Sequence, residues 1–415
     1  MSLVRNSIWN LAGFVIPSIL AIPGMAILAR KLSIGEYGLF MLIFALIGYI
    51  SIFDFGLNRA IIRFIAINEN DNVKKQKILG TSILFLTIIS LILSFLVFLL
   101  IDEIVFKLNI QDLNYDIVKN TLLLSIITIP FFLVTQCFTG YLEGLQKFKL
   151  LNIQKTITNS VLVILPVFFV LLKARVDYAI FGLMLARFLN LLIAYWFFIK
   201  FDKIKLIIDI SIVKEMIFYG GWITLSNIIS PIMTYFDRFV LSYFTNVTTV
   251  GYYSISTEIV TRMSIIPGSV AKALFPYMSS NKSMDKNKYY KYIIVIFLVT
   301  FLFCLPFLLF SEQIIRIWVG EKYLGVTVDV LKILILGLLF NAIAQVPFTF
   351  IQAIGLSRIT ALIHLSELIP YLVIMSYLIA HYGIYGAAIA WVLRMVVDFL
   401  IMHYFASKEI SRSLK

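Results

Sequence analysis

The chain has 415 residues, of which 61% are hydrophobic and 14% are charged, and its mean hydropathy is +0.98. Soluble domains are roughly half apolar and a quarter charged, so this composition excludes a soluble domain and indicates an integral membrane protein. The formal net charge is +13. No basic patch with interleaved aromatic residues accompanies that charge, so nucleic acid is not an expected partner.

Long apolar runs, taken in chain order, predict twelve transmembrane helices. A spanning helix needs about 20 apolar residues, and several uncharged stretches, such as 78–101 and 333–357, reach that length without interruption. Helices satisfy every backbone hydrogen bond inside lipid, so the fold class is an all-α integral membrane protein. The predicted spans are 8–29, 38–62, 78–101, 119–141, 151–172, 178–199, 216–242, 250–277, 291–311, 328–350, 358–380 and 384–405.

The positions of Lys and Arg in the loops predict the orientation, because these residues are retained on the cytoplasmic side of a membrane. With both termini inside, the inner segments hold 21 of the 35 basic residues and the outer segments hold 9. We therefore expect both termini in the cytoplasm. The remaining effect of the positive charge is an affinity for anionic membrane lipids.

The two halves of the chain resemble each other. Arg59 and Lys272 occupy matching positions at an offset of 213 residues, and DYAIFGLMLA (177–186) matches HYGIYGAAIA (381–390) at an offset of 204. Six spans per repeat is an even number, so both halves enter the membrane from the same side. Such a parallel pair of lobes forms a cleft between them.

The repeat predicts three parts of the chain. These are an N-terminal six-helix lobe (1–200), a basic cytoplasmic linker (201–214) and a C-terminal six-helix lobe (215–415). An undivided bundle of twelve helices is the alternative.

Three motifs resemble a known family. RKLSIGEYGLF (30–40) is similar to the outer loop and second helix of the polysaccharide-transport flippases, and GYLEGLQKFKLLN (140–152) is similar to their connection between helices 4 and 5. YFDRFVLSYFTNVTTVGYYSIS (235–256) resembles their seventh and eighth helices. The resemblance extends over the whole chain and points to the Wzx-type O-antigen-unit flippases of the multidrug/oligosaccharidyl-lipid/polysaccharide exporter superfamily.

This resemblance implies two lobes that face each other across a central cavity, lined mainly by helices 1, 2, 7 and 8, and that open alternately to either side. The implied substrate is an undecaprenyl-pyrophosphate-linked oligosaccharide, an O-antigen or capsule repeat unit, moved from the inner to the outer leaflet of the bacterial cytoplasmic membrane. The implied protein partners are a polysaccharide polymerase and a chain-length regulator. No cofactor is implied.

Charged residues inside the spans are the candidate site. A charge at the bilayer centre costs about 2.5 kcal/mol or more, so such residues face a cavity or a partner. A pyrophosphate carries several negative charges, and the planar guanidinium of Arg binds phosphate oxygens in pairs. The substrate-binding candidates are Arg59, Arg187, Arg238, Arg262 and Lys272, and the candidates for ion coupling or structural pairing are Asp54, Asp237 and Glu258.

Glu258 and Arg262 are the most central pair. They lie 7 and 11 residues after Gly251, which is roughly 10 and 17 Å along a helix axis, and their i,i+4 spacing favours an ion pair. Arg394 and Asp398 repeat this spacing in the last span, whereas Arg187 and Glu367 have no partner nearby in sequence. The alternative for all of these residues is an ion pair that only fixes helix packing.

Asp237 and Arg238 are expected at the outer rim, because they lie 21 residues after the predicted start of their span near Met216, about 32 Å along the helix. Arg238 is expected to face the cavity mouth, and Asp237 to meet a basic neighbour such as Arg30. Neighbours on a helix point in different directions, so the two are predicted to act separately.

The other candidates lie in the second and eighth spans. Arg59 and Lys272 are expected near the cytoplasmic rim, where they either receive the pyrophosphate or anchor the helices to lipid headgroups. Asp54 precedes a glycine that interrupts the helix, and an ion-coupling role is one interpretation of it.

Two further functions stay open. A cation-coupled drug or metabolite exporter of the same superfamily would have nearly the same fold but an acidic cavity. A membrane polysaccharide polymerase or glycosyltransferase would need catalytic residues in a large loop, and the longest outer loops, 102–118 and 312–327, carry no D-x-D motif or His/Glu pair. The three histidines are too far apart in sequence to suggest a metal site, so no metal is expected.

Overall fold

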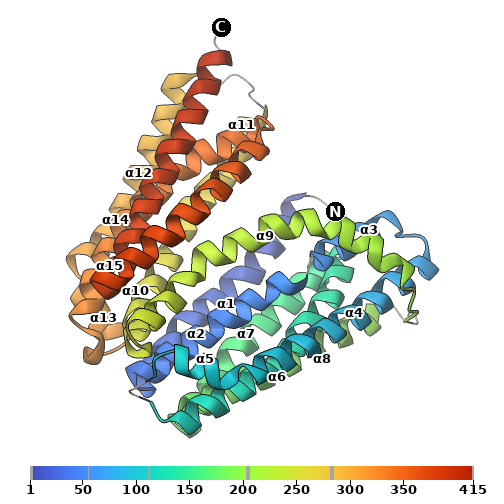
Figure 1. Cartoon of the computed structure of the whole chain (residues 1–415). Coiled ribbons are helices and arrows are strands. Elements are labelled where there is room, and N and C mark those ends of the chain that lie inside the picture. The colour runs from blue at the N-terminus through green and yellow to red at the C-terminus, as the bar shows by residue number, and fades with distance from the viewer. Residues whose placement is uncertain (1–2, 55, 111–112, 202–205, 281–284, 414–415) are drawn as a thin grey trace. The chain divides into compact units, whose positions relative to one another are not determined.

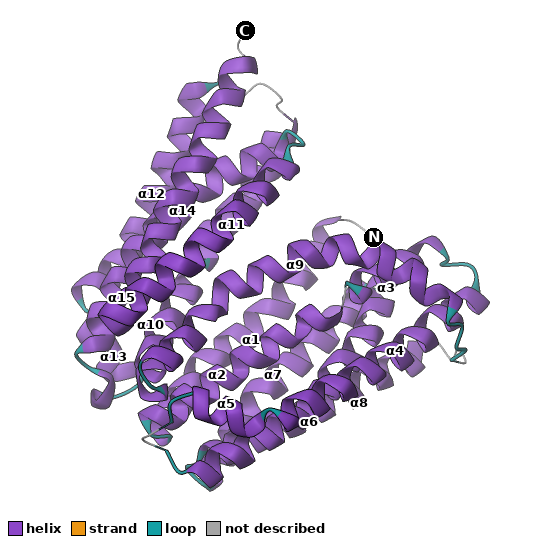
Figure 2. Ribbon diagram, viewed as in Figure 1, coloured by secondary structure: helices purple, strands orange, loops and turns teal. Residues whose placement is uncertain are grey.

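The computed structural model of the chain describes residues 3–54, 56–110, 113–201, 206–280 and 285–413 (Figure 1). These residues form helices joined by short loops, with no strand among them (Figure 2). The predicted all-α fold class is confirmed. The N-terminal half contains α1 (Leu3–Lys31), α2 (Ile34–Ile50), the 3-10 turn η1 (Ser51–Asp54), α3 (Leu57–Ile67), α4 (Asn72–Leu99), α5 (Ile101–Lys107), α6 (Tyr115–Gly144), α7 (Phe148–Leu172) and α8 (Val176–Phe201).

The C-terminal half follows the same plan. It contains α9 (Ser211–Phe244), α10 (Val247–Met263), α11 (Ile265–Ser280), α12 (Lys286–Leu309), α13 (Ser311–Trp318), the 3-10 turn η2 (Glu321–Tyr323), α14 (Val326–Ala353) and α15 (Ser357–Ser413). Each of the twelve predicted spans falls on one of these helices, on two consecutive helices or on one arm of α15. Within the described residues, eight helical segments are long and apolar enough to cross a membrane, so the chain is a multi-pass membrane protein.

The long helix α15 is two helices joined at Gly383. This glycine has φ +55° and ψ −129°, a conformation that is strained for any residue with a side chain. A Cβ atom at Gly386 would collide with the carbonyl of Leu378, so the backbone is tightly folded back here. The first arm (357–382) and the second arm (384–413) therefore correspond to the last two predicted spans.

The second span of each half is broken. In the first half the break lies at η1, where the Asp54 carboxylate accepts the Gly56 N–H at 2.7 Å and Gly56 has φ +69°. In the second half α10 ends at Met263, whose carbonyl has no helical donor because Pro267 lacks an N–H. Residues 51–56 shifted by the repeat offset of 213 are 264–269, so the two breaks occupy matching positions.

Two compact units divide the chain, residues 1–235 and 236–415, and the division falls inside α9. In the first unit α6 packs against α3, α4 and α8, and Figure 1 shows α6 and α8 side by side. A Cβ atom at Gly144 of α6 would lie 2.7 Å from the Ile62 carbonyl of α3, because glycine lets the two backbones approach closely. In the second unit α14 takes the matching role and packs against α10, α11, α12 and α15.

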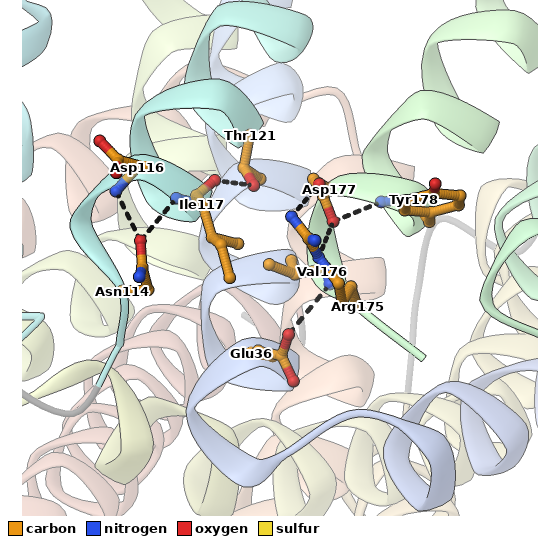
Figure 3. Close-up of polar contacts among 9 residues, drawn as sticks. All are labelled: Glu36, Asn114, Asp116, Ile117, Thr121, Arg175, Val176, Asp177 and Tyr178. Carbon is orange, nitrogen blue, oxygen red and sulfur yellow. Dashed lines mark hydrogen bonds and ion pairs between the residues drawn. The ribbon is translucent and has the colours of Figure 1, made fainter. Parts of the chain in front are cut away.

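The motif RKLSIGEYGLF contributes a hydrogen bond between α2 and α8 of the first unit (Figure 3). Ser33 and Glu36 form a capping box, in which the Glu36 N–H donates to Ser33 Oγ at 3.2 Å and the Ser33 N–H donates to Glu36 Oε2 at 3.0 Å. The other carboxylate oxygen of Glu36 accepts the Val176 N–H of α8 at 3.2 Å. Beside it, Arg175 and Asp177 form a two-point ion pair at 3.1 and 2.7 Å. The motif therefore holds the first turns of α2 and α8 together.

Candidate functional site

Asp237 and Arg238 of α9 are buried within the second unit, with exposed fractions of 5% and 4%. The hydroxyl of Tyr253 in α10 donates to Asp237 Oδ2 at 2.7 Å, and the Arg238 backbone N–H donates to Asp237 Oδ1 at 2.8 Å. The packing of α10 over this part of α9 therefore encloses the Asp237 carboxylate.

The burial of both side chains differs from the expectation of two exposed rim residues, whereas the expected positions of Arg238 at the cavity mouth and of Asp237 beside Arg30 stay predictions. The partner that the structure places on the Asp237 carboxylate is Tyr253. The helix α9 starts at Ser211, earlier than expected, and Asp237 lies 7 residues before its end at Phe244, about 10 Å along the axis.

Arg238, Glu258 and Arg262 form a group that we call the arginine cluster. The guanidinium of Arg238 donates to Thr257 Oγ1 at 3.2 Å and lies 4.0 Å from Glu258 Oε1. The other oxygen of Glu258 accepts from Arg262 at 3.3 Å. One carboxylate thus lies between two guanidinium groups, and the predicted Glu258–Arg262 pair is confirmed.

Exposure separates the members of the arginine cluster. The side chain of Arg262 is 29% exposed, whereas those of Arg238 and Glu258 are 5% and 14% exposed. Arg262 is therefore the most exposed side chain of the three. With two cations and one anion, the cluster keeps a net positive charge.

A second group lies on α15, and we call His364, Glu367 and Asp398 the carboxylate site. His364 Nε2 is 3.4 Å from Asp398 Oδ1, so the two arms of α15 meet there. The Glu367 side chain is 7% exposed, and neither of its oxygens has a hydrogen-bond partner. Sequence reasoning treated Glu367 and Asp398 separately and did not include His364. The i,i+3 spacing of His364 and Glu367 was the available signal for their sharing a helix face.

Arg394 and Tyr371 lie between the carboxylate site and the buried carboxylate of α9. The Arg394 guanidinium lies over the Tyr371 ring, 5.2 Å from its centroid, and the two side chains also hydrogen-bond. Asp237 interacts electrostatically with both residues. The second unit therefore holds a continuous series of polar side chains from α9 and α10 to both arms of α15.

The remaining predicted residues lie apart from these groups. In the first unit, Asp54 caps the break before α3 and Arg59 is exposed. Arg187 of α8 lies over the ring of Phe132 at 4.7 Å, and its Nε atom is buried with no hydrogen-bond partner. Lys272 of α11, in the second unit, is exposed.

The chemistry of these groups suits the binding of anions by guanidinium. A partly exposed arginine that is paired with an acid offers N–H donors to phosphate oxygens. No group of three or more His, Cys, Asp or Glu side chains that could hold a metal ion occurs among the described residues.

Comparison with known proteins gives a consistent result. The family model described as "Polysaccharide biosynthesis protein" matches residues 3–282. A Shigella flexneri protein named "Putative O-antigen transporter" is 38% identical over 416 residues, with 99% of each chain covered. Among solved structures, the lipid II flippase MurJ in an inward closed conformation has a TM-score of 0.79 at 18% identity, covering 99% of this chain and 91% of that chain. An inward-facing multidrug resistance MATE family transporter of the MOP superfamily has a TM-score of 0.73 at 17% identity, covering 100% of this chain and 96% of that chain.

The two solved structures are similar to this chain in fold. The family assignment rests on the family model and on the full-length relative, and it confirms the resemblance seen in the three motifs. The chain therefore belongs to the polysaccharide biosynthesis protein family and has the fold of the MOP superfamily transporters.

Proposed function

We propose that the protein is a flippase that moves an undecaprenyl-pyrophosphate-linked oligosaccharide, an O-antigen or capsule repeat unit, from the inner to the outer leaflet of the bacterial cytoplasmic membrane. The full-length similarity to a protein named as an O-antigen transporter supports this substrate class. The observation that carries the proposal is the arginine cluster, because it presents a partly exposed arginine side chain within a membrane protein.

In this proposal Arg262 binds the pyrophosphate of the lipid carrier. Glu258 orients the guanidinium of Arg262. The Arg238 guanidinium, 4.0 Å from Glu258 Oε1, in turn positions Glu258. Arg59 and Lys272 receive the lipid headgroup near the cytoplasmic rim, since both side chains are exposed. Arg187 is a further anion contact, because its Nε atom lacks a partner.

Transport proceeds by alternating access of the two predicted lobes, 1–200 and 215–415, joined by the linker 201–214. The protein acts as a transporter and not as an enzyme, and its products pass to a polysaccharide polymerase and a chain-length regulator. The lobes bend at the helix breaks beside Gly56 and Ser264, where the regular hydrogen bonding of the second span of each repeat is interrupted.

The test is transport by the purified protein in liposomes that contain a fluorescent undecaprenyl-pyrophosphate-linked glycan. We expect the protein to move the glycan to the opposite leaflet, measured by its accessibility to a membrane-impermeant glycosidase. A folded sample that moves cationic drugs but no lipid-linked glycan would establish the alternative, a cation-coupled exporter.

The site is tested in cells. Arg262→Ala is expected to lower surface polysaccharide by at least tenfold at unchanged protein level, because the pyrophosphate loses a charged donor worth about 1.5–3 kcal/mol. Arg316→Ala is the matched control, since Arg316 forms the same i,i+4 pair with Glu312 at 2.8 Å but is 51% exposed on α13. Normal polysaccharide in the Arg262→Ala strain would assign Arg262 to helix packing alone.

A further inference from the structure

Glu367 is a buried carboxyl group without a hydrogen-bond partner. It lies 9 residues after the start of the predicted span 358–380, about 14 Å along the helix and so close to the middle of the membrane. An ionised carboxylate is strongly disfavoured in an apolar region unless donors surround it. A protonated carboxyl group carries no charge and is itself a hydrogen-bond donor.

The groups around Glu367 come from both arms of α15. Asp398 on the second arm and His364 on the first arm interact with it electrostatically, as does Arg394. From α14, Phe348 stacks on the His364 ring at 5.9 Å. The described charged residues of α14 are Asp329 and Lys332, which lie in its first two turns and far along the helix from Phe348.

The ionisable groups of the carboxylate site have neutral counterparts in the first half of the chain. At an offset of 211 residues, Gly144-Leu145 matches Gly355-Leu356, and Glu367 matches Thr156. At the offset of 204, Asp398 matches Ala194 and Arg394 matches Asn190. The helices α7 and α8, which hold these residues, pack closely against each other. Since the matching pair packs with neutral residues, the carboxylate site of the second unit calls for another explanation.

We propose that the carboxylate site binds a proton, with Glu367 as the acceptor and Asp398 and His364 as its neighbours. Hydronium transfers its proton to a Glu367 carboxylate oxygen and leaves as water, so no oxidant or further reactant is needed. Ionisable residues inside membrane helices commonly serve as proton relays in transporters. A proton suits the site better than a metal cation, because the Arg394 guanidinium repels a second cation.

The position of the site gives the proton a role in transport, and this role rests on the proposed function. Arg394 and Tyr371 link the carboxylate site to Asp237, which Tyr253 holds beside Arg238. A change of one charge at Glu367 therefore alters the electrostatic potential at Arg394 and Asp237, and through them at the arginine cluster. Protonation is thereby coupled to the affinity of Arg262 for an anionic headgroup.

Infrared difference spectroscopy of the full-length protein in liposomes tests the proton site without any substrate. We expect the carbonyl-stretch band of a protonated carboxylic acid at neutral pH, its loss at alkaline pH, and its absence in Glu367→Gln. Glu312→Gln, which changes an exposed glutamate of the same unit, is expected to keep the band. A Glu367→Gln spectrum identical to that of the wild type would overturn the proposal. If Glu367→Gln does not fold, Asp398→Asn takes its place, and an unshifted band in that variant has the same consequence.

The second measurement is the ratio of glycan transport rates with and without a pH gradient across the liposome. The wild-type ratio is expected to exceed one, and Glu367→Gln is expected to bring it to one. An unchanged ratio in Glu367→Gln, or a wild-type protein driven by a sodium gradient alone, overturns the coupling. A wild-type protein that moves no glycan under any gradient refutes the proposed function, while the infrared band still decides whether the proton site exists.

Discussion

Tyr253 holds the buried carboxylate of Asp237 in place, and its loss has a measurable cost. Replacing Tyr253 by Phe keeps the ring and removes the hydroxyl that donates to Asp237 Oδ2 at 2.7 Å. We expect Tyr253→Phe to destabilise the second unit by about 1–3 kcal/mol, because a buried acceptor loses its donor. The measurement is the midpoint of thermal unfolding of the purified protein in detergent.

Tyr252→Phe is the control, since the ring of Tyr252 contacts Tyr323 edge-on at 6.0 Å. Equal midpoints for the two variants would contradict the assignment.

The individual residues show where sequence reasoning succeeds and where it fails. The Glu258–Arg262 pair was predictable, because both residues lie on one helix and spacing alone brings them together. The contact between Tyr253 and Asp237 was not, because it joins two helices and depends on how α10 rotates against α9. The burial of Arg238 escaped prediction for the same reason.

Residues 207–209, which precede α9, are held against the start of α4 by hydrogen bonds and an ion pair. The Ile207 N–H donates to the Gln76 carbonyl at 3.3 Å, Thr81 and the backbone of Asp209 exchange hydrogen bonds at 2.8 and 3.3 Å, and Lys77 pairs with Asp209 at 2.9 Å. Hydrogen bonds from Ser211 and Lys77 hold the pKa of Asp209 below its ordinary value, so this carboxylate is ionised at neutral pH. This part of the predicted linker therefore belongs with the first unit.

Gly80 permits the close approach of residues 207–209 to α4, since a Cβ atom at Gly80 would lie 2.5 Å from the Ile207 oxygen and 2.8 Å from the Ile207 nitrogen. Gly80→Ala is expected to displace the segment and to raise the rate of trypsin cleavage at Lys203 and Lys205 several-fold. The measurement is the time course of digestion of the purified protein. Gly268→Ala is the matched control, because no atom lies within 4 Å of a Cβ atom there. Cleavage of Gly80→Ala at the wild-type rate would show that the contact adds nothing to the linker's protection.

Helix positions were far more predictable than helix ends. Apolar runs of sufficient length, either uncharged or interrupted by only a few charges, located each span, and the break beside Asp54 followed from the glycine two residues later. The end of α10 and the fold-back at Gly383 depend on backbone conformations that apolar composition does not record. The earlier start of α9, at Ser211, was missed because Lys214 and Glu215 interrupt the apolar sequence just before the predicted start at Met216.

The uneven distribution of basic residues, 21 on the predicted inner side and 9 on the outer side, predicts the orientation of the whole chain. Single cysteines test it, because the native Cys137 and Cys304 are both buried and react poorly. We expect Glu321→Cys, in the loop before α14, to react with a membrane-impermeant maleimide added to intact cells. Glu69→Cys, in the loop before α4, is expected to react only after the membrane is opened, because Lys and Arg beside that loop oppose its translocation. Both side chains are exposed in the structure, so a difference in labelling reports the side of the membrane and not burial. The reverse pattern would place the termini outside, and it would also reverse the direction in which Arg59 and Lys272 could receive a substrate.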